Sequence, residues 1–490
     1  MRAIHLVALL VALIELGTRL AGASPGSRLT LRDALTTAVR TSPHLAGVKI
    51  DVSIADAHVM TAEGASDWIV AGSVTLDATR DTPAASTTPQ LVDAGTLTVS
   101  AGLTRPLPGG GSVGLRADAR ISQDHTALSI ARGQTMDARS WARTTDVRIV
   151  FRQPLLRGWD GDAAPRTQLA RTRAARNVAE LEATTTAAGA VRDIVRAYWE
   201  VRAARNEVEI RRTSLTLAEE QLRVTGARIT SGRAADSEAL AVGQAISVRQ
   251  DELAQAEVTF VRRSTELRRL IGSEVSANAY EVEPLDAPVL AASDPDLDRE
   301  IVFALERNPE LVSVRARGTA AAIEVDVTRR GLLPSLDLDV SAGPHGTDLT
   351  TLAGVGATVE LQLSVPIGNR TAAGALAVAT RQQRRVRYDE AELRGQVSSA
   401  VIEAIVAMRS ARTRAGALAD AVRLGDEAIA AEIERWQQGK STNYDVMKRQ
   451  AERADSALRH GRAVVDYRQA EAALDALTGA ILPRYGIAIR

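Results

Sequence analysis

The stretch "LTVSAGLTRPLPGGGSVGLRADARIS", residues 97–122, decides the fold. Before its central turn, leucine, valine and alanine alternate strictly with threonine, serine and glycine. After the turn, Val113, Leu115 and Ile121 alternate with Arg116 and Asp118. Because successive side chains of a strand point to opposite faces, the stretch predicts a β-hairpin with one aliphatic face and one polar or charged face.

The same alternation recurs in other parts of the chain. It appears in "TDVRIVFRQP" (145–154), in "LDLDV" (336–340) and in "GVGATVELQLSV" (354–365), and more weakly near residues 70–78. We therefore expect strands over about residues 68–153 in the first half and 335–366 in the second half.

Two kinds of sheet produce this pattern. A soluble sheet packs its apolar face on a core, whereas a transmembrane β-barrel turns that face to lipid and its polar face to a water-filled lumen. The turn at 105–112 is short, and the links at 81–95 and 123–144 are predicted to be long and polar, an alternation that favours the barrel. The few aromatic residues near the strand ends, Trp68, Trp141 and Phe151, argue against it.

Long helices follow the strands. Residues 166–230 contain no proline and carry apolar residues at spacings of three and four, as do residues 371–438. At 1.5 Å per residue, each helix would be on the order of 100 Å long. Four to six strands are too few to close a barrel, which takes about eight, so the chain is expected to assemble with copies of itself around an axis.

Composition and the N-terminus indicate export. Residues 1–23 contain Arg2, an apolar run and a final Ala-Gly-Ala, the pattern of a secretory signal peptide. The 490 residues include no cysteine, so disulfides and a lipidated N-terminal cysteine are excluded. Sixty basic residues balance 60 acidic ones, which gives no reason to expect a nucleic-acid partner.

The chain contains an internal repeat, with two halves of similar sequence. "LTLRDALTTAVRTSPHL" (29–45) is similar to the stretch beginning at residue 295, and the spacing from Gly232 to Gly272 equals that from Gly439 to Gly479. The expected organisation is a first repeat at 24–272 with a helix hairpin at 166–272, a linker at 273–296, a second repeat at 297–479 with a hairpin at 371–479, and a tail at 480–490.

The stretch "ERWQQGKSTNYDVM" (434–447) raises another interpretation, because Gly-Lys-Ser-Thr ends a phosphate-binding P-loop. The complete motif needs a glycine at position 434, which is glutamate, and a preceding buried strand, whereas the residues before it have helical spacing. A helix-hairpin corner therefore explains Gly439 better than a nucleotide site does.

The order of these motifs resembles that of the TolC-type outer-membrane efflux proteins, over nearly the whole mature chain. The resemblance rests on the helix-starting pattern near residue 29 and its repeat near 297, on "FRQPLLRG" (151–158) and "LSVPIGN" (363–369), and on the glycine turns followed by "LIG" and "LTG". It implies an α+β fold: a homotrimeric transmembrane β-barrel continued by a long periplasmic α-helical barrel of coiled-coil helices.

The resemblance also implies partners and a function. The chain would be a passive outer-membrane conduit in contact with outer-membrane lipid, working with a periplasmic adaptor and an inner-membrane pump of the RND or ABC type in efflux or type I secretion. The family's usual protomer supplies four strands, but residues 97–122 read as an added hairpin, so that three copies of six strands would give 18 rather than 12.

The candidate site residues lie at the corners of the two helix hairpins, the expected periplasmic tip. Asp445 matches the family's gate aspartate, Lys448 falls where the family has a second aspartate, and Glu238 is the repeat counterpart of Asp445. A ring of carboxylates is a cation-selective constriction, which a salt bridge to Lys448 would weaken. The expected adaptor-docking residues are Gly232, Arg233, Gly439, Lys440, Ser441, Thr442 and Tyr444. Solvated charges on an exposed helix end are the alternative for all of them.

Two other classes of function remain open at this point. An exported coiled-coil scaffold with a soluble sheet is the main alternative, and the alternation of aliphatic and charged faces disfavours it. An enzyme is disfavoured because the scattered histidines, including His44 and His345, form no catalytic or metal-ligating spacing. We therefore expect no cofactor and no metal.

Overall fold

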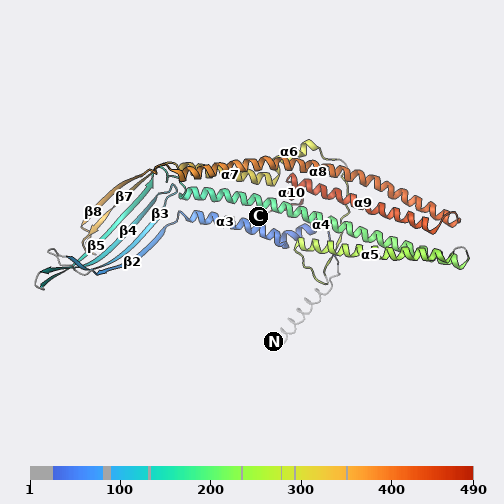
Figure 1. Cartoon of the computed structure of the whole chain (residues 1–490), viewed down its shortest axis with the longest axis horizontal. Coiled ribbons are helices and arrows are strands. Elements are labelled where there is room, and N and C mark those ends of the chain that lie inside the picture. Colours follow the sequence, from blue (N-terminus) through green and yellow to red (C-terminus); the bar gives the residue numbers. More distant parts are fainter. Residues whose placement is uncertain are drawn as a thin grey trace, which may run out of the picture. The chain divides into compact units, whose positions relative to one another are not determined.

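The computed structural model describes residues 26–80, 90–130, 134–232, 235–277, 279–291, 294–348 and 351–488. Its elements follow each other in blocks of helices and strands (Figure 1). The chain divides into two compact units. The sheet unit consists of Val52–Ala179 and Val314–Asp389, and the hairpin unit consists of Met1–Asp51, Glu180–Ser313 and Glu390–Arg490.

The sheet unit contains one antiparallel sheet of six strands in the order β2-β3-β4-β5-β7-β8. The strands are β2 (Ile69–Arg80), β3 (Gln90–Pro106), β4 (Ser112–Ile130), β5 (Gln134–Pro154), β7 (Ser335–Gly346) and β8 (Gly354–Ser364). Strands β2 and β8 form the two edges, because each pairs with one neighbour.

The strands are longer than the sequence predicts. The expected long links at 81–95 and 123–144 are wrong, because β3 already begins at Gln90, β4 continues to Ile130 and β5 begins at Gln134. Their polar, Ala-, Ser- and Thr-rich composition suggested loops, yet continuous pairing down to Ile130 opposite Gln134 satisfies the backbone hydrogen bonds. Residues 81–89 and 131–133 lie outside the described residues.

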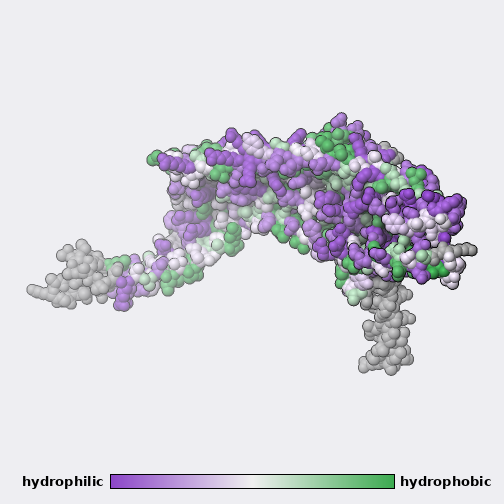
Figure 2. Space-filling model, turned by 45° about the vertical axis from the view of Figure 1, so that its right-hand side comes forward, coloured by the Kyte–Doolittle hydropathy of each residue, from purple (hydrophilic) through white to green (hydrophobic). Residues whose placement is uncertain are grey.

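The two faces of the sheet differ in chemistry, as the alternation predicts. The register places Val74 beside Val99 and Ala119 on one face, and places Ser100 beside Asp118 and Asp146 on the other. The first face, here called the aliphatic face, is exposed, and hydrophobic residues are visible along the strands in Figure 2. It includes Val70, Val74, Leu76, Val99, Leu103, Leu115, Ile149, Val355, Val359, Leu361 and Leu363. The opposite, charged face carries Arg116, Asp118, Arg120, Asp146, Arg148, Arg152, Asp339 and Glu360.

The turn between β3 and β4 lies at the end of the sheet where the helices start. The Leu107 amide donates to the Gly111 carbonyl at 2.7 Å, and Gly110 has a φ of 95°, which favours glycine. The Pro108 carbonyl accepts a bond of 3.0 Å from the Arg166 amide, in the first turn of α4 (Pro165–Thr230). The short turn is thus attached to the start of the long helix.

Two helix hairpins dominate the rest of the chain. The first joins α4, with 66 residues, to α5 (Asp236–Ile271), and the second joins α8 (Arg370–Gln437), with 68 residues, to α9 (Asn443–Leu477). The other helices are α2 (Leu31–Thr41), α3 (Pro43–Gly64), α6 (Leu297–Arg307), α7 (Pro309–Arg330) and α10 (Ile481–Tyr485). Short strands β1 (Gly26–Leu29) and β6 (Glu281–Pro284) pair in parallel. None of the helices within the described ranges combines the length and the apolarity needed to cross a membrane.

The core of the hairpin unit follows the predicted apolar stripes. On α4, Val191, Ile194 and Tyr198 are at most 2% exposed, and on α8 Val401 and Ile405 are fully buried. Toward the hairpin corner the buried positions of α4 change from aliphatic to polar, with Gln221 and Thr225 among them. Because a buried polar side chain needs a hydrogen-bond partner, Gln221 and Thr225 must form hydrogen bonds near the hairpin corner.

Candidate functional site at the hairpin corners

Both predicted corners carry glycine in the left-handed region. Gly232 has a φ of 65° and Gly439 a φ of 73°. At the second corner the Lys440 amide donates to the Arg435 carbonyl at 2.8 Å and the Gly439 amide to the Trp436 carbonyl at 3.0 Å, which is a Schellman motif. Gly439 therefore ends helix α8, a different task from the opening glycine of a phosphate loop. Arg233 lies outside the described residues.

Helix α9 begins with a capping box built from Thr442 and Asp445. The Asp445 amide donates to Thr442 Oγ1 at 3.2 Å, and the Asp445 carboxylate accepts from Thr442 Oγ1 at 2.6 Å and from the Thr442 amide at 3.2 Å. These hydrogen bonds hold the pKa of Asp445 below its usual value, with a smaller contribution from the positive charge of Lys448. Asp445 is therefore charged at neutral pH.

Asn443 ties the two hairpins together. Its side chain is 3% exposed, and its Oδ1 accepts hydrogen bonds from Gln221 Nε2 and from Thr225 Oγ1, the latter at 3.2 Å. Its Nδ2 donates to Glu238 Oε2 on α5. One buried side chain at the start of α9 thus bonds to both helices of the first hairpin. Glu238, expected at a gate, has this partner within the same chain.

Arg228 makes a second tie between the corners. Its Nη1 donates to the Trp436 carbonyl at 3.1 Å, and its guanidinium lies 4.4 Å from the centre of the Trp436 ring. Trp436 is 5% exposed, so the contact is shielded from water. Arg228 is in the last turn of α4 and Trp436 in the last turn of α8, so the contact joins the ends of the two long helices.

The remaining predicted tip residues are less closely connected. Lys440 Nζ donates to Gln438 Oε1 at 3.0 Å, and Ser441 Oγ donates to the carboxylate of Glu432. Tyr444 is 68% exposed. Lys448 is exposed on α9 and makes no ion pair with Asp445 among the described residues. The predicted pairing of Asp445 with Lys448 is therefore replaced, within one chain, by the capping box with Thr442.

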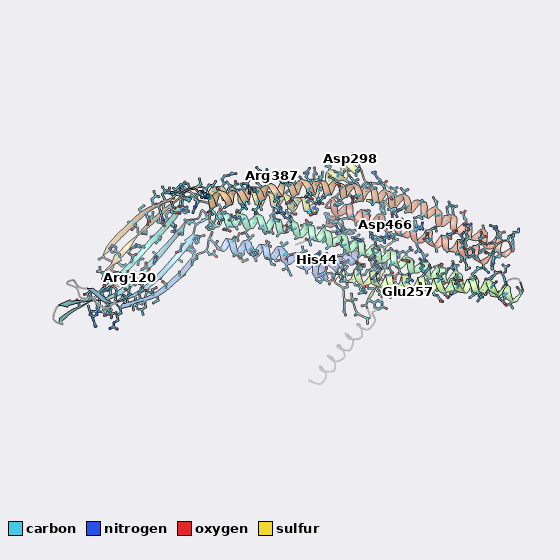
Figure 3. The ribbon with its side chains drawn as sticks, viewed as in Figure 1. His44, Arg120, Glu257, Asp298, Arg387 and Asp466 are labelled. Atoms are coloured by element: carbon cyan, nitrogen blue, oxygen red, sulfur yellow. The ribbon has the colours of Figure 1, made fainter. Side chains whose placement is uncertain are left out.

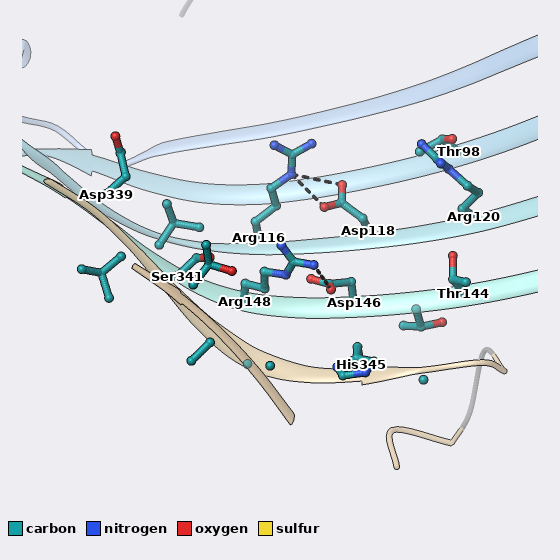
Figure 4. A pocket seen from close by; sticks show the side chains of 18 of the residues that line it. Thr98, Arg116, Asp118, Arg120, Thr144, Asp146, Arg148, Asp339, Ser341 and His345 are labelled. Atoms are coloured by element: carbon teal, nitrogen blue, oxygen red, sulfur yellow. Dashed lines mark hydrogen bonds and ion pairs between the residues drawn. The ribbon is translucent and has the colours of Figure 1, made fainter. Parts of the chain in front are cut away.

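A second polar region lies on the charged face of the sheet, where a hollow of about 920 Å³ is lined by alternating cations and carboxylates (Figure 4). Arg116 Nε lies 2.8 Å from an oxygen of Asp118, and Arg148 pairs with Asp146 in the same way on the next strand. These arginines neutralise carboxylates two residues away on their own strands. The hollow therefore carries mixed charge.

Histidine and carboxylate side chains are scattered over the described part of the chain. No group of three or more His, Asp or Glu side chains there could hold a metal ion. His44 lies on α3 and Arg120 on β4, and Asp466 on α9 pairs with Arg414 at 3.0 Å and with Arg462 at 2.8 Å (Figure 3).

The sequence comparison gives one match, to the family described as outer membrane efflux protein, over residues 301–480. The matched segment includes α8, α9 and the Gly439 corner. Over these residues the chain is similar to the outer membrane efflux proteins. No curated protein matches the chain in sequence.

Solved outer-membrane channels share the fold of this chain. The outer membrane protein VceC from Vibrio cholerae has a TM-score of 0.66 at 14% identity, over 92% of this chain and 96% of that chain. The CmeC outer membrane channel of Campylobacter jejuni has a TM-score of 0.67 at 13% identity, over 92% and 85%. The open state of the Neisseria gonorrhoeae MtrE outer membrane channel has a TM-score of 0.64 at 14% identity, over 92% and 89%. At such identities the likeness concerns the fold.

Sequence reasoning missed the residues that join the corners of the two helix hairpins. Asn443, Gln221, Arg228 and Trp436 were absent from the predicted site. One signal was available, because Thr442-x-x-Asp445 is the sequence pattern of a capping box and fixes where α9 begins. The partners of Asn443 lie more than 200 positions away in the chain, beyond the reach of any local pattern.

Proposed function

We propose that the chain is one subunit of a trimeric outer-membrane channel that conducts substrates passively from the periplasm to the exterior. The sheet would form part of a β-barrel, and the helix hairpins would form an α-helical barrel in the periplasm. The two structural repeats, at 24–272 and 297–479, would have arisen by duplication. In support, α2 and α6 both have 11 residues, and α3 and α7 both have 22.

The exposed aliphatic face of the sheet is the observation that carries this proposal. Val74 is 71% exposed, Val355 is 83% exposed and Leu361 is 61% exposed, and none of the described helices and strands of the sheet unit covers them. Soluble proteins rarely expose a continuous apolar patch of this kind. Lipid acyl chains are the environment that suits such a face when the opposite face is charged.

The two sheet edges support assembly from several copies. Strands β2 and β8, of 12 and 11 residues, have unpaired backbone groups along their outer sides. In a bilayer each unsatisfied group costs several kcal/mol, so the edges must be paired. Strand β8 of one copy would pair with β2 of the next, and three copies of six strands would close an 18-stranded barrel.

We place the gate at the hairpin corners. A ring of three Asp445 carboxylates around the axis would form a cation-selective constriction, with Lys448 and Glu238 nearby. The bonds of Asn443 to Gln221 and Glu238 would hold the two hairpins of each subunit in the closed arrangement. Opening would require these bonds to rearrange.

We place adaptor docking at the same end of the molecule. The exposed residues there are Gly232, Gly439, Lys440, Thr442 and Tyr444; Ser441 is half-buried, and Arg233 is adjacent in the sequence. A periplasmic adaptor bound to them would connect the channel to an inner-membrane pump of the RND or ABC type, which would supply the energy. The substrate class would be set by that pump.

Cysteine crosslinking tests the trimer and the closure of the sheet. The chain has no native cysteine, so Thr75→Cys on β2 and Thr358→Cys on β8 can be introduced together on the charged side of the edge strands. A bismaleimide should give covalent dimers and trimers on denaturing gels. The same reaction with a single cysteine at Thr144 on the central strand β5 should give monomers. Monomers from both variants would refute edge-to-edge closure and favour the soluble scaffold.

The gate is tested by separating the charge of Asp445 from its capping role. Asp445→Asn removes the charge and keeps an oxygen that accepts from Thr442, whereas Thr442→Ala removes the cap and keeps the charge. In planar bilayers, Asp445→Asn should weaken block by divalent cations about tenfold, since three carboxylates are lost. Thr442→Ala should retain block while destabilising the start of α9 by about 1 kcal/mol, detectable as faster amide exchange there. If divalent cations block the wild type, Asp445→Asn and Thr442→Ala equally, Asp445 is not part of the gate.

A further inference from the structure

Strand β5 carries two arginines and a tryptophan at the far end of the aliphatic face. Arg139, Trp141 and Arg143 lie two positions apart and share the parity of Ile149 and Phe151, so they lie on that same face. All three are exposed, and Trp141 is 64% exposed. The aliphatic face therefore ends in a cationic rim, here defined by Arg139, Trp141 and Arg143.

The arginines of this rim differ from those across the sheet. On the charged face, Arg116 pairs with Asp118, Arg148 with Asp146 and Arg152 with Asp339. Among the described residues, neither Arg139 nor Arg143 has a carboxylate partner.

Two acidic residues share the aliphatic face near the rim. Asp137 lies two positions before Arg139 on β5 and shares its parity, and Asp93 lies two strands from Arg139, about 10 Å away. Asp93 lies directly opposite Arg80 on β2, which offsets its charge. The two arginines of the rim therefore outnumber the one remaining carboxylate, Asp137, and this end of the face keeps a net positive charge among the described residues.

The spacing of aromatic residues along the face matches a membrane. At the helix end of the sheet, Trp68 stacks with Arg105, whose guanidinium lies 5.7 Å from the ring centre, and the register aligns Arg105 through Val113 with Phe151. Trp141 is ten residues from Phe151, or about 33 Å along the strand. A strand tilt near 40° reduces this to about 25 Å, the height of the apolar band of an outer-membrane barrel.

We propose that Arg139, Trp141 and Arg143 bind the phosphate-bearing headgroup of a lipid in the outer leaflet. Guanidinium groups bind phosphate oxygens through paired, charge-assisted hydrogen bonds, and tryptophan prefers the boundary between acyl chains and headgroups. The acyl chains of that lipid would lie on the aliphatic residues next to the rim, such as Ile149. This inference rests on the proposed function, since it requires the far end of the sheet to reach the outer leaflet.

The test uses the full-length trimer in nanodiscs that contain bisphosphorylated lipid A, with native mass spectrometry of the extracted protein to count retained lipid. The double variant Arg139→Ala/Arg143→Ala should lower the apparent affinity for lipid A about tenfold or more, because two charge-assisted contacts are lost. The matched control is Arg120→Ala, an exposed arginine on the charged face that has no carboxylate partner among the described residues. It should change the affinity less than twofold. If alanine impairs assembly, Arg139→Gln/Arg143→Gln serves in its place.

The possible outcomes separate this inference from the proposed function. Reduced binding in the rim variant with unchanged single-channel conductance supports the inference. Equal binding of lipid A by the rim variant and the wild type overturns it, as does equal binding of dephosphorylated lipid A by the wild type. A wild-type protein that forms no channel overturns the proposed function itself.

Discussion

Arginine at position 74 should prevent assembly of the channel, whereas arginine at position 75 should be tolerated. Val74 is 71% exposed in the middle of the aliphatic face, in register with Val99 and Ala119. An arginine there would sit near the proposed bilayer midplane, which costs about 2–4 kcal/mol for each copy in transmembrane barrels. Thr75 is on the opposite face, beside Thr98, where arginine would enter the water-filled lumen. The measurement is the amount of heat-modifiable trimer in the outer-membrane fraction.

The comparison of the two neighbouring positions controls for effects on strand propensity. Both variants place the same residue in the same edge strand, and they differ only in the face that receives the charge. A barrel with lipid on the aliphatic face predicts loss of trimer for Val74→Arg alone. Equal trimer from Val74→Arg and Thr75→Arg would show that the aliphatic face does not contact lipid.

Replacement of Asn443 by alanine should loosen the hairpin corners and raise the closed-state conductance of the channel. The side chain of Asn443 is buried and bonds to Gln221, Thr225 and Glu238. Its removal leaves buried polar groups without partners, each of which costs about 1–3 kcal/mol. Single-channel recording without adaptor should show a larger basal conductance, and hydrogen exchange should accelerate at the corners of both hairpins.

Tyr444→Ala is the matched control for this prediction. Tyr444 is adjacent to Asn443 on α9 but is 68% exposed. Its replacement should leave the basal conductance unchanged and weaken adaptor binding if the proposed docking surface is correct. A basal conductance that is unchanged in Asn443→Ala would show that the hairpins are held together by other contacts, such as that of Arg228 with Trp436.

The fold was predictable from the sequence where periodicity is strong. The alternation around residues 97–122 predicts strands with one aliphatic face, and the register of β2, β3 and β4 shows that face to be continuous. The 3–4 spacing of Val191, Ile194 and Tyr198 predicts the buried side of α4. The extent of β4 and β5 was not predictable, because their outer parts are polar and depend on cross-strand pairing for their structure.

The site was predictable only in its local features. Glycine at positions 232 and 439 indicates a left-handed helix end, and both φ angles are positive. The interaction of Asn443 with Gln221 joins segments 222 positions apart, and no sequence pattern encodes such a contact. The role of Asp445 in a capping box follows from local spacing, whereas its role in a gate depends on neighbouring copies and stays a prediction.

The unpaired edges of β2 and β8 have a genetic consequence. If three copies close the barrel, each subunit pairs with both neighbours, through β2 on one side and β8 on the other. A copy with one defective edge strand therefore prevents closure of any trimer that contains it. In a cell that makes equal amounts of intact and edge-defective protein, about one trimer in eight would contain only intact copies. Edge mutations in this protein should therefore be dominant, while mutations that prevent the chain from folding at all should be recessive.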